Sequence, residues 1–198
     1  MDMFGQLSLE RVEISRVRVS WIVADDFVDP AVDPGALADI GSTWGSWRTW
    51  RAWNTDNVLC HDKTKAKDLV TRAFQAVCNL YVPKSAYAEL GRPAGVQLFD
   101  GEFPAEFDSA EEIIAMHLLA SENDLVLLLG YNLSEPDTTD AFELHKRKNY
   151  LAAFASAIKM YPDTQWVIIN HDAELVSNLH ELENITCDTY ENVLHLLS

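Results

Sequence analysis

Side chains that could act as acids, bases or ligand contacts follow each of five segments that have the pattern of a β-strand. The five groups are Asp25-Asp26, His61-Asp62, Asp100-Gly101, Gly130-Tyr131-Asn132 and Asn170-His171-Asp172. In an open parallel sheet, ligands bind outside the carboxyl ends of the strands, because loops and helix N-termini with unpaired N–H groups meet there. We therefore expect a ligand site at these strand ends, although helix capping alone would also explain Asp62 and Asp172.

The carboxylates of this set are the candidates for catalysis. Asp25, Asp26 and Asp100 could act as an acid, a base or a holder of a metal-bound water, and burial could split the pKa values of a pair such as Asp25 and Asp100. The candidate ligand contacts are Trp47, Arg48, Arg51, Gly130, Asn132, Asn170 and His171. In this hypothesis Asn132 and Asn170 orient a ribose, and Arg48 or Arg51 meets a phosphate.

The segment 41–53 contains four tryptophans at every third residue, with two arginines between them. They are Trp44, Trp47, Arg48, Trp50, Arg51 and Trp53. This spacing drifts around an α-helix, whereas it would line one edge of a 3₁₀ turn. The rings and guanidinium groups could stack a base and bind a phosphate; alternatively, the rings fill the core beneath a long loop or form a subunit contact. The segment has neither the GxGxxG pattern of a dinucleotide site nor the lysine of a P-loop.

The cysteines and histidines do not have the spacing of a metal site. Cys60, Cys78 and Cys187 are an odd number without a CxxC pair, and no histidine lies in an HExxH pattern. We expect buried, reduced thiols and no dedicated metal site. Cys60 and His61 are adjacent on a predicted strand, so their side chains point to opposite faces and cannot pair directly as nucleophile and base.

The elements that must position these residues alternate between strand and helix from residue 57 onward. Strands are expected over 17–23, 57–60, 96–99, 124–130, 166–169 and 185–187, and helices over 64–81, 109–120, 140–160, 173–182 and 188–197. Residues 27–56 contain several prolines and glycines and are expected to form a long loop insertion with at most a short helix near 36–40. The run at 124–130 is almost entirely apolar, as in a central strand.

Right-handed crossovers turn this alternating order into a parallel sheet with helices on both faces. We predict an α/β fold: a single Rossmann-like three-layer domain over residues 1–198 with a mostly parallel sheet of five or six strands. The length of 198 residues suits one domain.

Charge and hydropathy restrict the partners. The formal net charge of −16 repels polyanions, which argues against general binding of nucleic acids or of anionic membranes. Mimicry of a polyanion is an alternative, but the acidic residues are dispersed and form no acidic tail. The sequence has no apolar run long enough for a membrane span and no signal-peptide pattern at its start, so a cytoplasmic protein is expected.

Three stretches in the C-terminal half resemble sirtuin-type NAD-binding domains. They are 123–136, which contains Gly130-Tyr131-Asn132 after an apolar run, 166–170, which ends in Ile169-Asn170, and 192–197. In that family an apolar strand ends in Gly-Thr-Ser-Leu and a later one in Ile-Asn. The resemblance implies that Gly130 and Asn132 approach the phosphate or the nicotinamide-side ribose, and Asn170 the adenosine ribose, of NAD or another nucleotide. The family's Gly-Ala-Gly run and zinc cysteine pairs are missing, so the resemblance does not imply deacylation.

Two functions fit these observations. The first is binding of a small nucleotide or nucleotide-sugar ligand at the strand ends, with hydrolysis or transfer of a glycosidic or phosphate bond. The second is a non-catalytic interaction protein that forms a homo-oligomer or holds a protein partner through its tryptophan-rich segment. Quenching of tryptophan fluorescence by nucleotides would favour the first, and a concentration-dependent mass that is lost in Trp47→Ala would favour the second.

Overall fold

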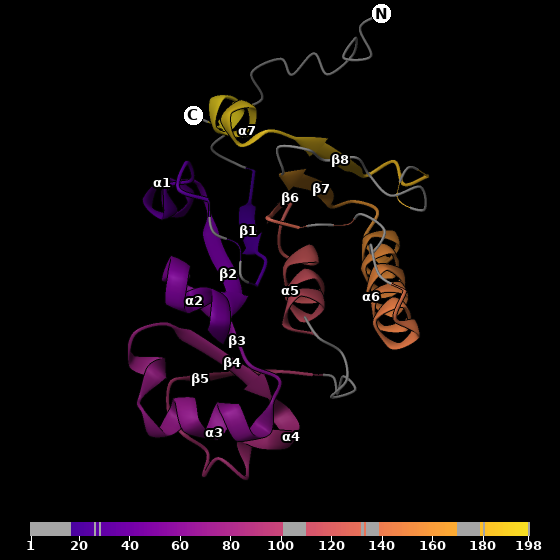
Figure 1. Cartoon of the computed structure of the whole chain (residues 1–198). Helices are drawn as coiled ribbons and strands as arrows, with labels where there is room; N and C mark the ends of the chain where they lie inside the picture. Colours follow the sequence, from indigo (N-terminus) through magenta and orange to yellow (C-terminus); the bar gives the residue numbers. More distant parts are fainter. Residues whose placement is uncertain are drawn as a thin grey trace, which may run out of the picture.

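One parallel β-sheet forms the centre of the molecule (Figure 1). The computed structural model describes residues 17–25, 27, 29–100, 110–131, 133, 139–169, 179 and 181–197. Within these residues the sheet has eight strands. They are β1 (Val19–Val23), β2 (Ser42–Ser46), β3 (Asn57–Leu59), β4 (Asn79–Pro83), β5 (Val96–Phe99), β6 (Leu125–Leu129), β7 (Gln165–Ile169) and β8 (Ile185–Asp188).

The strand order places the first strand of the chain inside the sheet. The order is β5-β4-β3-β2-β1-β6-β7-β8, and all neighbouring strands are parallel. Strands are added on one side of β1 up to β5, and the chain then crosses to the other side of β1 to form β6, with Val19 opposite Leu125 and Val23 opposite Leu129. The boundary between β1 and β6 is therefore a topological switch point, where ligand crevices occur in sheets of this kind.

Helices cover both faces of the sheet and give the fold three layers. They are α1 (Pro34–Ile40), α2 (Trp47–Trp53), α3 (Lys63–Thr71), α4 (Lys84–Tyr87), α5 (Ala110–Ala120), α6 (Ala141–Met160) and α7 (Tyr190–Leu197), with a short 3₁₀ turn, η2, at Phe74–Ala76. Figure 1 shows α5 and α6 on one side of the sheet and α1 and α2 on the other. The α/β class and the Rossmann-like three-layer arrangement predicted from the sequence are confirmed.

Alternation along the strands divides the core between the two faces, because successive side chains of a strand point to opposite sides. On β1, Ile22 packs in a cluster with α5 and α6, whereas Trp21 and Val23 pack in a second cluster with α1, α2 and α7. A third cluster joins β3 and β4 to α3 on the same face as the second. The central strands are thus buried on both faces, as a doubly covered parallel sheet requires.

The short helix expected near 36–40 is present as α1, but the predicted loop over the rest of 27–56 is wrong, because this stretch also contains β2 and α2. β2 has the sequence STWGS, whose small polar residues do not have the composition of a strand, but it lies between β1 and β3 and is almost completely buried. α2 begins at Ser46, whose side chain accepts hydrogen bonds from the backbone N–H groups of Arg48 and Thr49, and ends at Asn54 in the left-handed conformation.

The predicted helix over 64–81 is also too long, and the sheet has more strands than expected. α3 ends at Thr71, and β4 begins at Asn79. Ala73 has a φ of 56°, a conformation that stops the helix although no glycine or proline marks the point. The missed strands β2 and β4 raise the count from five or six to eight. Most of the helix expected over 173–182 lies outside the described residues.

Among the described residues, no helix is long and apolar enough to cross a bilayer.

Candidate functional site

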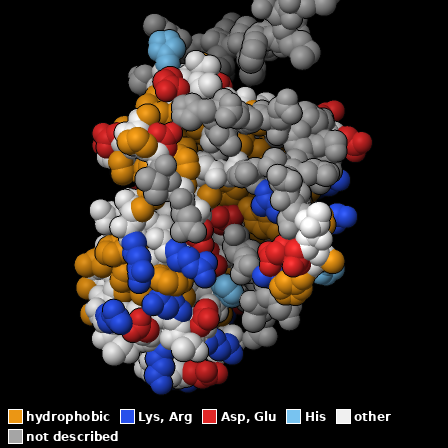
Figure 2. All heavy atoms as spheres, viewed as in Figure 1, with side chains coloured by type: hydrophobic (Ala, Val, Ile, Leu, Met, Phe, Trp, Pro, Cys, Tyr) orange, Lys and Arg blue, Asp and Glu red, His pale blue; other side chains and the backbone are white. Residues whose placement is uncertain are grey.

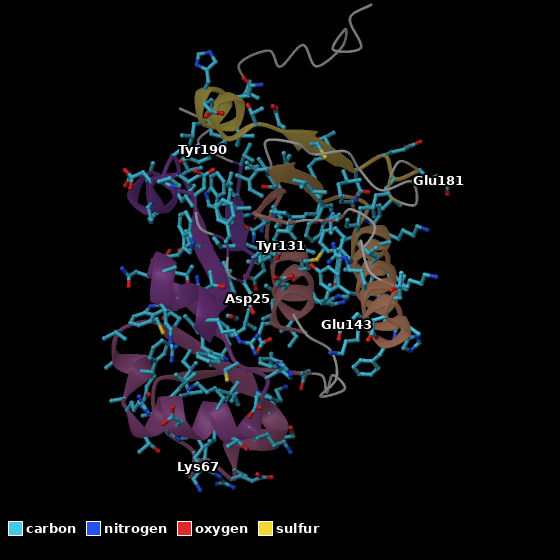
Figure 3. The ribbon with its side chains drawn as sticks, in the orientation of Figure 1. Asp25, Lys67, Tyr131, Glu143, Glu181 and Tyr190 are labelled. Atoms are coloured by element: carbon cyan, nitrogen blue, oxygen red, sulfur yellow. The ribbon has the colours of Figure 1, made fainter. Side chains whose placement is uncertain are left out.

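The site lies where β1 and β6 end, beside the first turn of α5. The backbone N–H of Ala24 donates to the carbonyl oxygen of Leu129 (2.9 Å), which keeps the two strands paired up to Asp25. Figure 3 shows Asp25 and Tyr131 between the sheet and α5. The view in Figure 2 shows acidic side chains at the bottom of a hollow near the middle of this face. The switch point therefore carries a concentration of acidic groups in a recessed position.

Three donors from one short segment hold the carboxylate of Asp25. Thr49 Oγ1 donates to Asp25 Oδ1 (2.9 Å), Arg48 Nη1 donates to Oδ2 (3.0 Å), and Ser46 Oγ also donates to Oδ1. The side chain of Asp25 is only 13% exposed. The ion pair between Asp25 and Arg48 joins two of the residues proposed from the sequence, although the sequence did not predict their contact.

Gly45 allows α2 to bring Thr49 this close. A Cβ atom at Gly45 would lie 2.8 Å from the Cβ of Thr49, so a larger residue would push α2 away from β2. Ser46 then turns the chain directly from the strand into the helix. The local sequence Gly45-Ser46 thus fixes the hydroxyl groups that bind Asp25.

Glu112, in the first turn of α5, is a buried carboxyl group next to Asp25. Its Oε1 accepts from the backbone N–H of Asp25 (3.2 Å), and its Oε2 accepts from the hydroxyl of Tyr150 (2.6 Å). Burial raises the pKa of Glu112 to about 7, and the negative charges of Asp25 and Glu111 act in the same direction. Both protonation states of Glu112 are therefore populated near neutral pH.

Glu111 and His61 form an acid–imidazole contact beside Asp25 and Glu112. Nδ1 of His61 lies 2.7 Å from Oε1 of Glu111, which also accepts from the backbone N–H of His61 (3.3 Å). The hydrogen bond to Glu111 raises the pKa of His61 above its usual value, against the effect of burial. This pair connects the end of β3 to the first turn of α5.

Two tyrosines complete the buried surroundings. Burial raises the pKa values of Tyr131 and Tyr150 well above the ordinary value for a phenol, and the charge of Glu112 adds to the effect for both. Their hydroxyl groups are thus neutral at physiological pH. Tyr150 comes from α6 and Tyr131 follows β6, whereas Asp25 follows β1, so residues from both sides of the β1–β6 boundary build the site.

The four tryptophans of segment 41–53 have different surroundings. Trp44 and Trp53 are buried, Trp53 stacks on Phe27 with ring centroids 5.3 Å apart, and Trp50 contacts the edge of Phe74. Trp47 is half-buried and lies within 6 Å of three cationic groups. The segment therefore does not form one continuous wall of indoles, because the helical spacing turns successive rings to different neighbours.

Gly130 is required by packing and by backbone conformation. Its φ is +80°, and a Cβ atom there would lie 2.3 Å from Cδ2 of Phe27. The space beside its Cα is filled by the ring of Phe27, which in turn stacks on Trp53.

Asp100 does not lie with Asp25. It follows β5 at the edge of the sheet, with β4, β3 and β2 between β5 and β1, so the two strands are about 19 Å apart at the usual spacing of parallel strands. The exposed carboxylate of Asp100 pairs with Lys84 (2.6 Å). The pairing of Asp25 with Asp100 across one crevice is therefore wrong. Asp26, Asn132, Asn170 and His171 lie outside the described residues.

A thiol nucleophile and a metal centre find no support in the described ranges. Burial raises the pKa of Cys60 far above the usual value, and the nearby carboxylates of Glu111 and Asp62 add to the effect, so its thiol stays protonated. Asp62 caps α3, as its capping interpretation predicts, by accepting from the backbone N–H of Lys65 (2.8 Å).

Among the described residues, no three His, Cys, Asp or Glu side chains are grouped so that they could hold a metal ion.

Sequence reasoning missed Glu111, Glu112, Tyr150 and Lys65. In the sequence, Ser109-Ala110-Glu111-Glu112 has the spacing of a helix capping box, which gives the glutamates a structural interpretation. Ser109 lies outside the described residues. A signal was present, however: Glu111 and Glu112 are adjacent acids in a helix that is otherwise apolar apart from His117, and both are buried. Buried acids at a strand-end edge are unusual enough to indicate function.

Comparisons of this chain with protein-family models, with curated proteins and with solved structures give no match. The functional argument therefore depends on the geometry of the switch-point site.

Proposed function

We propose that the chain binds a small nucleotide-like ligand at the β1–β6 switch point and hydrolyses or transfers a glycosidic or phosphate bond of that ligand by acid–base chemistry. One observation carries this proposal: the backbone N–H of Asp25 donates to Glu112, a buried carboxyl group whose pKa is raised to about 7 by burial and by the nearby charge of the Asp25 carboxylate. Two neighbouring carboxyl groups in different environments can divide the roles of acid and base between them.

The division of roles follows from the contacts. Glu112 is protonated in a large fraction of molecules at neutral pH, so it can supply a proton to a leaving group. Asp25 is held in place by hydroxyl groups and by Arg48, so its carboxylate can take up a proton or stabilise developing positive charge. The His61–Glu111 pair next to them provides an additional route for protons, through an imidazole.

The ligand class is proposed from the position of the site and from the sequence. Rossmann-like sheets bind ribose-containing ligands at their switch points, and Asn132 and Asn170, which follow β6 and β7 in the sequence, are the proposed ribose contacts. Nucleotides such as NAD belong to this class.

The alternative function, self-association through the tryptophan-rich segment, has less support. Two of the four rings are buried in the chain's own core and a third packs on Phe74, which leaves Trp47 as the ring with the most polar surroundings.

The test is a search for product with matched variants. The protein is incubated with NAD, nucleosides and nucleoside mono-, di- and triphosphates, and released base, sugar and phosphate are measured by chromatography. We expect turnover of at least one of these compounds, and a loss of about 10²-fold or more in kcat/KM in Asp25→Asn and in Glu112→Gln. The control variants Asp163→Asn and Glu122→Gln, at exposed positions, should keep the wild-type rate.

The pH dependence gives a second readout. If Glu112 supplies a proton, kcat/KM should fall as the pH rises above about 7, and this limb of the profile should be absent from the residual activity of Glu112→Gln. Absence of product from every compound, or full activity in Asp25→Asn, would contradict the proposal.

A further inference from the structure

Three cationic side chains surround one indole next to the candidate active site. The guanidinium carbon of Arg51 lies 4.9 Å from the ring centroid of Trp47, that of Arg48 lies 5.4 Å away, and Nζ of Lys65 lies 4.2 Å away. Trp47, Arg48 and Arg51 come from α2, and Lys65 comes from α3, so two separate helices converge on this ring. Figure 2 shows Lys and Arg side chains around hydrophobic atoms beside the acidic hollow.

The carboxylates nearby neutralise only part of the charge of this cluster. Arg48 is paired with Asp25, and Lys65 is paired with Asp68 (3.1 Å), which is shared with Arg72 (2.8 Å). Arg51 makes no ion pair with any carboxylate of the described residues. In a chain with a net charge of −16, a local excess of positive charge is a marked exception. Three like charges at these distances repel one another, and the π-face of Trp47 offsets only part of that repulsion.

We propose that Arg48, Arg51 and Lys65 around Trp47 form a binding site for the phosphate group of a phosphomonoester. This inference rests on the proposed function, since it names the group by which the ligand of that site is held. A phosphomonoester dianion has three terminal oxygens and can accept from two guanidinium groups and one ammonium group at once, whereas a carboxylate has two oxygens and one charge. The ring of Trp47 holds the three cations near each other before the ligand arrives.

Arg48 connects this cluster to the acid–base site. Its side chain is half exposed, and it contacts both Trp47 and Asp25. When Arg48 turns toward a phosphate, Asp25 keeps the hydrogen bonds from Ser46 and Thr49. The phosphate would therefore be bound one side chain away from Asp25, and a ligand that spans the two sites is a phosphorylated sugar or nucleoside rather than a free base.

The experiment measures binding of ribose 5-phosphate, ribose and inorganic phosphate to the full chain by isothermal titration calorimetry. We expect ribose 5-phosphate to bind at least about tenfold more tightly than ribose, which corresponds to about 1.4 kcal/mol, and inorganic phosphate to compete with it. Arg51→Gln should weaken ribose 5-phosphate binding about tenfold, because Arg51 is exposed and its removal leaves no buried partner. Lys65→Gln should act in the same direction.

Lys67→Gln is the matched control. Lys67 is on α3 like Lys65, but Figure 3 shows it pointing away from the site at the outer side of the molecule. This variant should bind ribose 5-phosphate within about twofold of the wild type. Equal binding of ribose and ribose 5-phosphate, no binding of either, tight binding of inorganic phosphate alone, or an unchanged affinity in Arg51→Gln would overturn the inference.

The outcomes separate this inference from the proposed function. If Asp25→Asn abolishes turnover while Arg51→Gln binds ribose 5-phosphate normally, the phosphate site is rejected and the acid–base site stands. If Arg51→Gln loses binding but no compound is turned over, the phosphate site stands and the catalytic proposal fails. Asp25→Asn itself should bind ribose 5-phosphate at least as tightly as the wild type, because a negative charge beside Arg48 is removed.

Discussion

Glu112 shows how a single buried side chain links the site to pH. Its carboxyl group is buried, accepts a hydrogen bond from Tyr150 and lies near the negative charges of Asp25 and Glu111. Burial without a cationic partner disfavours the charged form, so the group takes up a proton at a pH where an ordinary glutamate has lost it. The energetic cost of this arrangement depends on pH and can be measured.

The contribution of Glu112 to the free energy of unfolding should fall as the pH rises from about 4.5 to about 7. In that window the folded chain retains a proton that the unfolded chain has lost, so folding becomes less favourable with increasing pH, by at most on the order of 3 kcal/mol. We therefore compare the free energies of unfolding of Glu112→Gln and the wild type, measured by urea unfolding at pH 5 and at pH 8. The value for Glu112→Gln minus that for the wild type should be larger at pH 8 than at pH 5.

Glu122→Gln is the control for this measurement, because it removes the same charge from an exposed position. Its stability relative to the wild type should change by only a few tenths of a kcal/mol between the two pH values. A difference between Glu112→Gln and the wild type that is the same at pH 5 and pH 8 would show that Glu112 is not protonated in the folded chain at neutral pH.

The candidate site could be predicted from the sequence only in part. The polar strand ends indicated Asp25, and the tryptophan–arginine spacing indicated Trp47 and Arg48. In the structure Arg48 contacts both Asp25 and the ring of Trp47. The partner of Asp25 was not predictable, because Asp100 and Glu112 are both acids near predicted strand ends or helix starts. Their distances from Asp25 depend on the order of strands in the sheet, which local sequence does not encode.

At the scale of the elements, helix α2 and strands β2 and β4 escaped prediction for different reasons. β2 lacks β-branched apolar residues because close packing against α2 requires Gly45. The residues of η2 and β4 continue the helical spacing of α3, with Leu69, Phe74 and Leu80 among the apolar positions, so periodicity joined them into one helix. By contrast, β5, α6 and β6 have clear start and stop signals, such as Asp140 at the N-cap of α6, and their predicted bounds agree with the structure to within a residue.

The junction between β6 and its following loop depends on Gly130. We expect Gly130→Ala to destabilise the fold by about 2–4 kcal/mol, because an alanine there combines an unfavourable positive φ with a clash against Phe27. The measurement is urea unfolding. Gly91→Ala is the matched control: its φ is +78°, but a Cβ atom there meets nothing within 4 Å, so it should cost only about 1 kcal/mol.

A double substitution isolates the contribution of packing at this junction. In a Phe27→Gly background the ring and the Cβ atom of residue 27, which a Cβ at Gly130 would approach to 2.3 Å and 2.7 Å, are both removed, and Gly130→Ala should then cost about as much as Gly91→Ala. Equal destabilisation by Gly130→Ala and Gly91→Ala in the wild-type background would show that Phe27 does not pack on Gly130.

At the scale of the whole molecule, the dominant electrostatic feature is the net charge of −16. Like charges distributed over a compact fold repel one another more than they do in an expanded unfolded chain. The exceptions are local, above all the cations around Trp47. Higher ionic strength should therefore stabilise the folded molecule, because it screens the repulsion among the excess acidic groups.

We expect the Tm to rise with added salt. Raising NaCl from roughly 10 mM to roughly 150 mM shortens the screening length from about 30 Å to about 8 Å, which weakens the repulsion among surface carboxylates. Thermal unfolding followed by circular dichroism measures the effect, and KCl at the same concentrations should give the same shift. A Tm that falls with salt would mean that attractive ion pairs outweigh the net repulsion.

The position of β1 between β2 and β6 has a consequence for synthesis on the ribosome. Asp25 and the hydroxyl groups that bind it all precede residue 50, and β1 to β5 can pair with one another as soon as they emerge. Glu111, Glu112 and β6 are translated later, so the nascent chain exposes one hydrogen-bonding edge of β1 until β6 arrives. A translation pause between β5 and β6 would prolong that exposure, and chaperones that bind extended polypeptide would have their best opportunity to bind this chain during the pause.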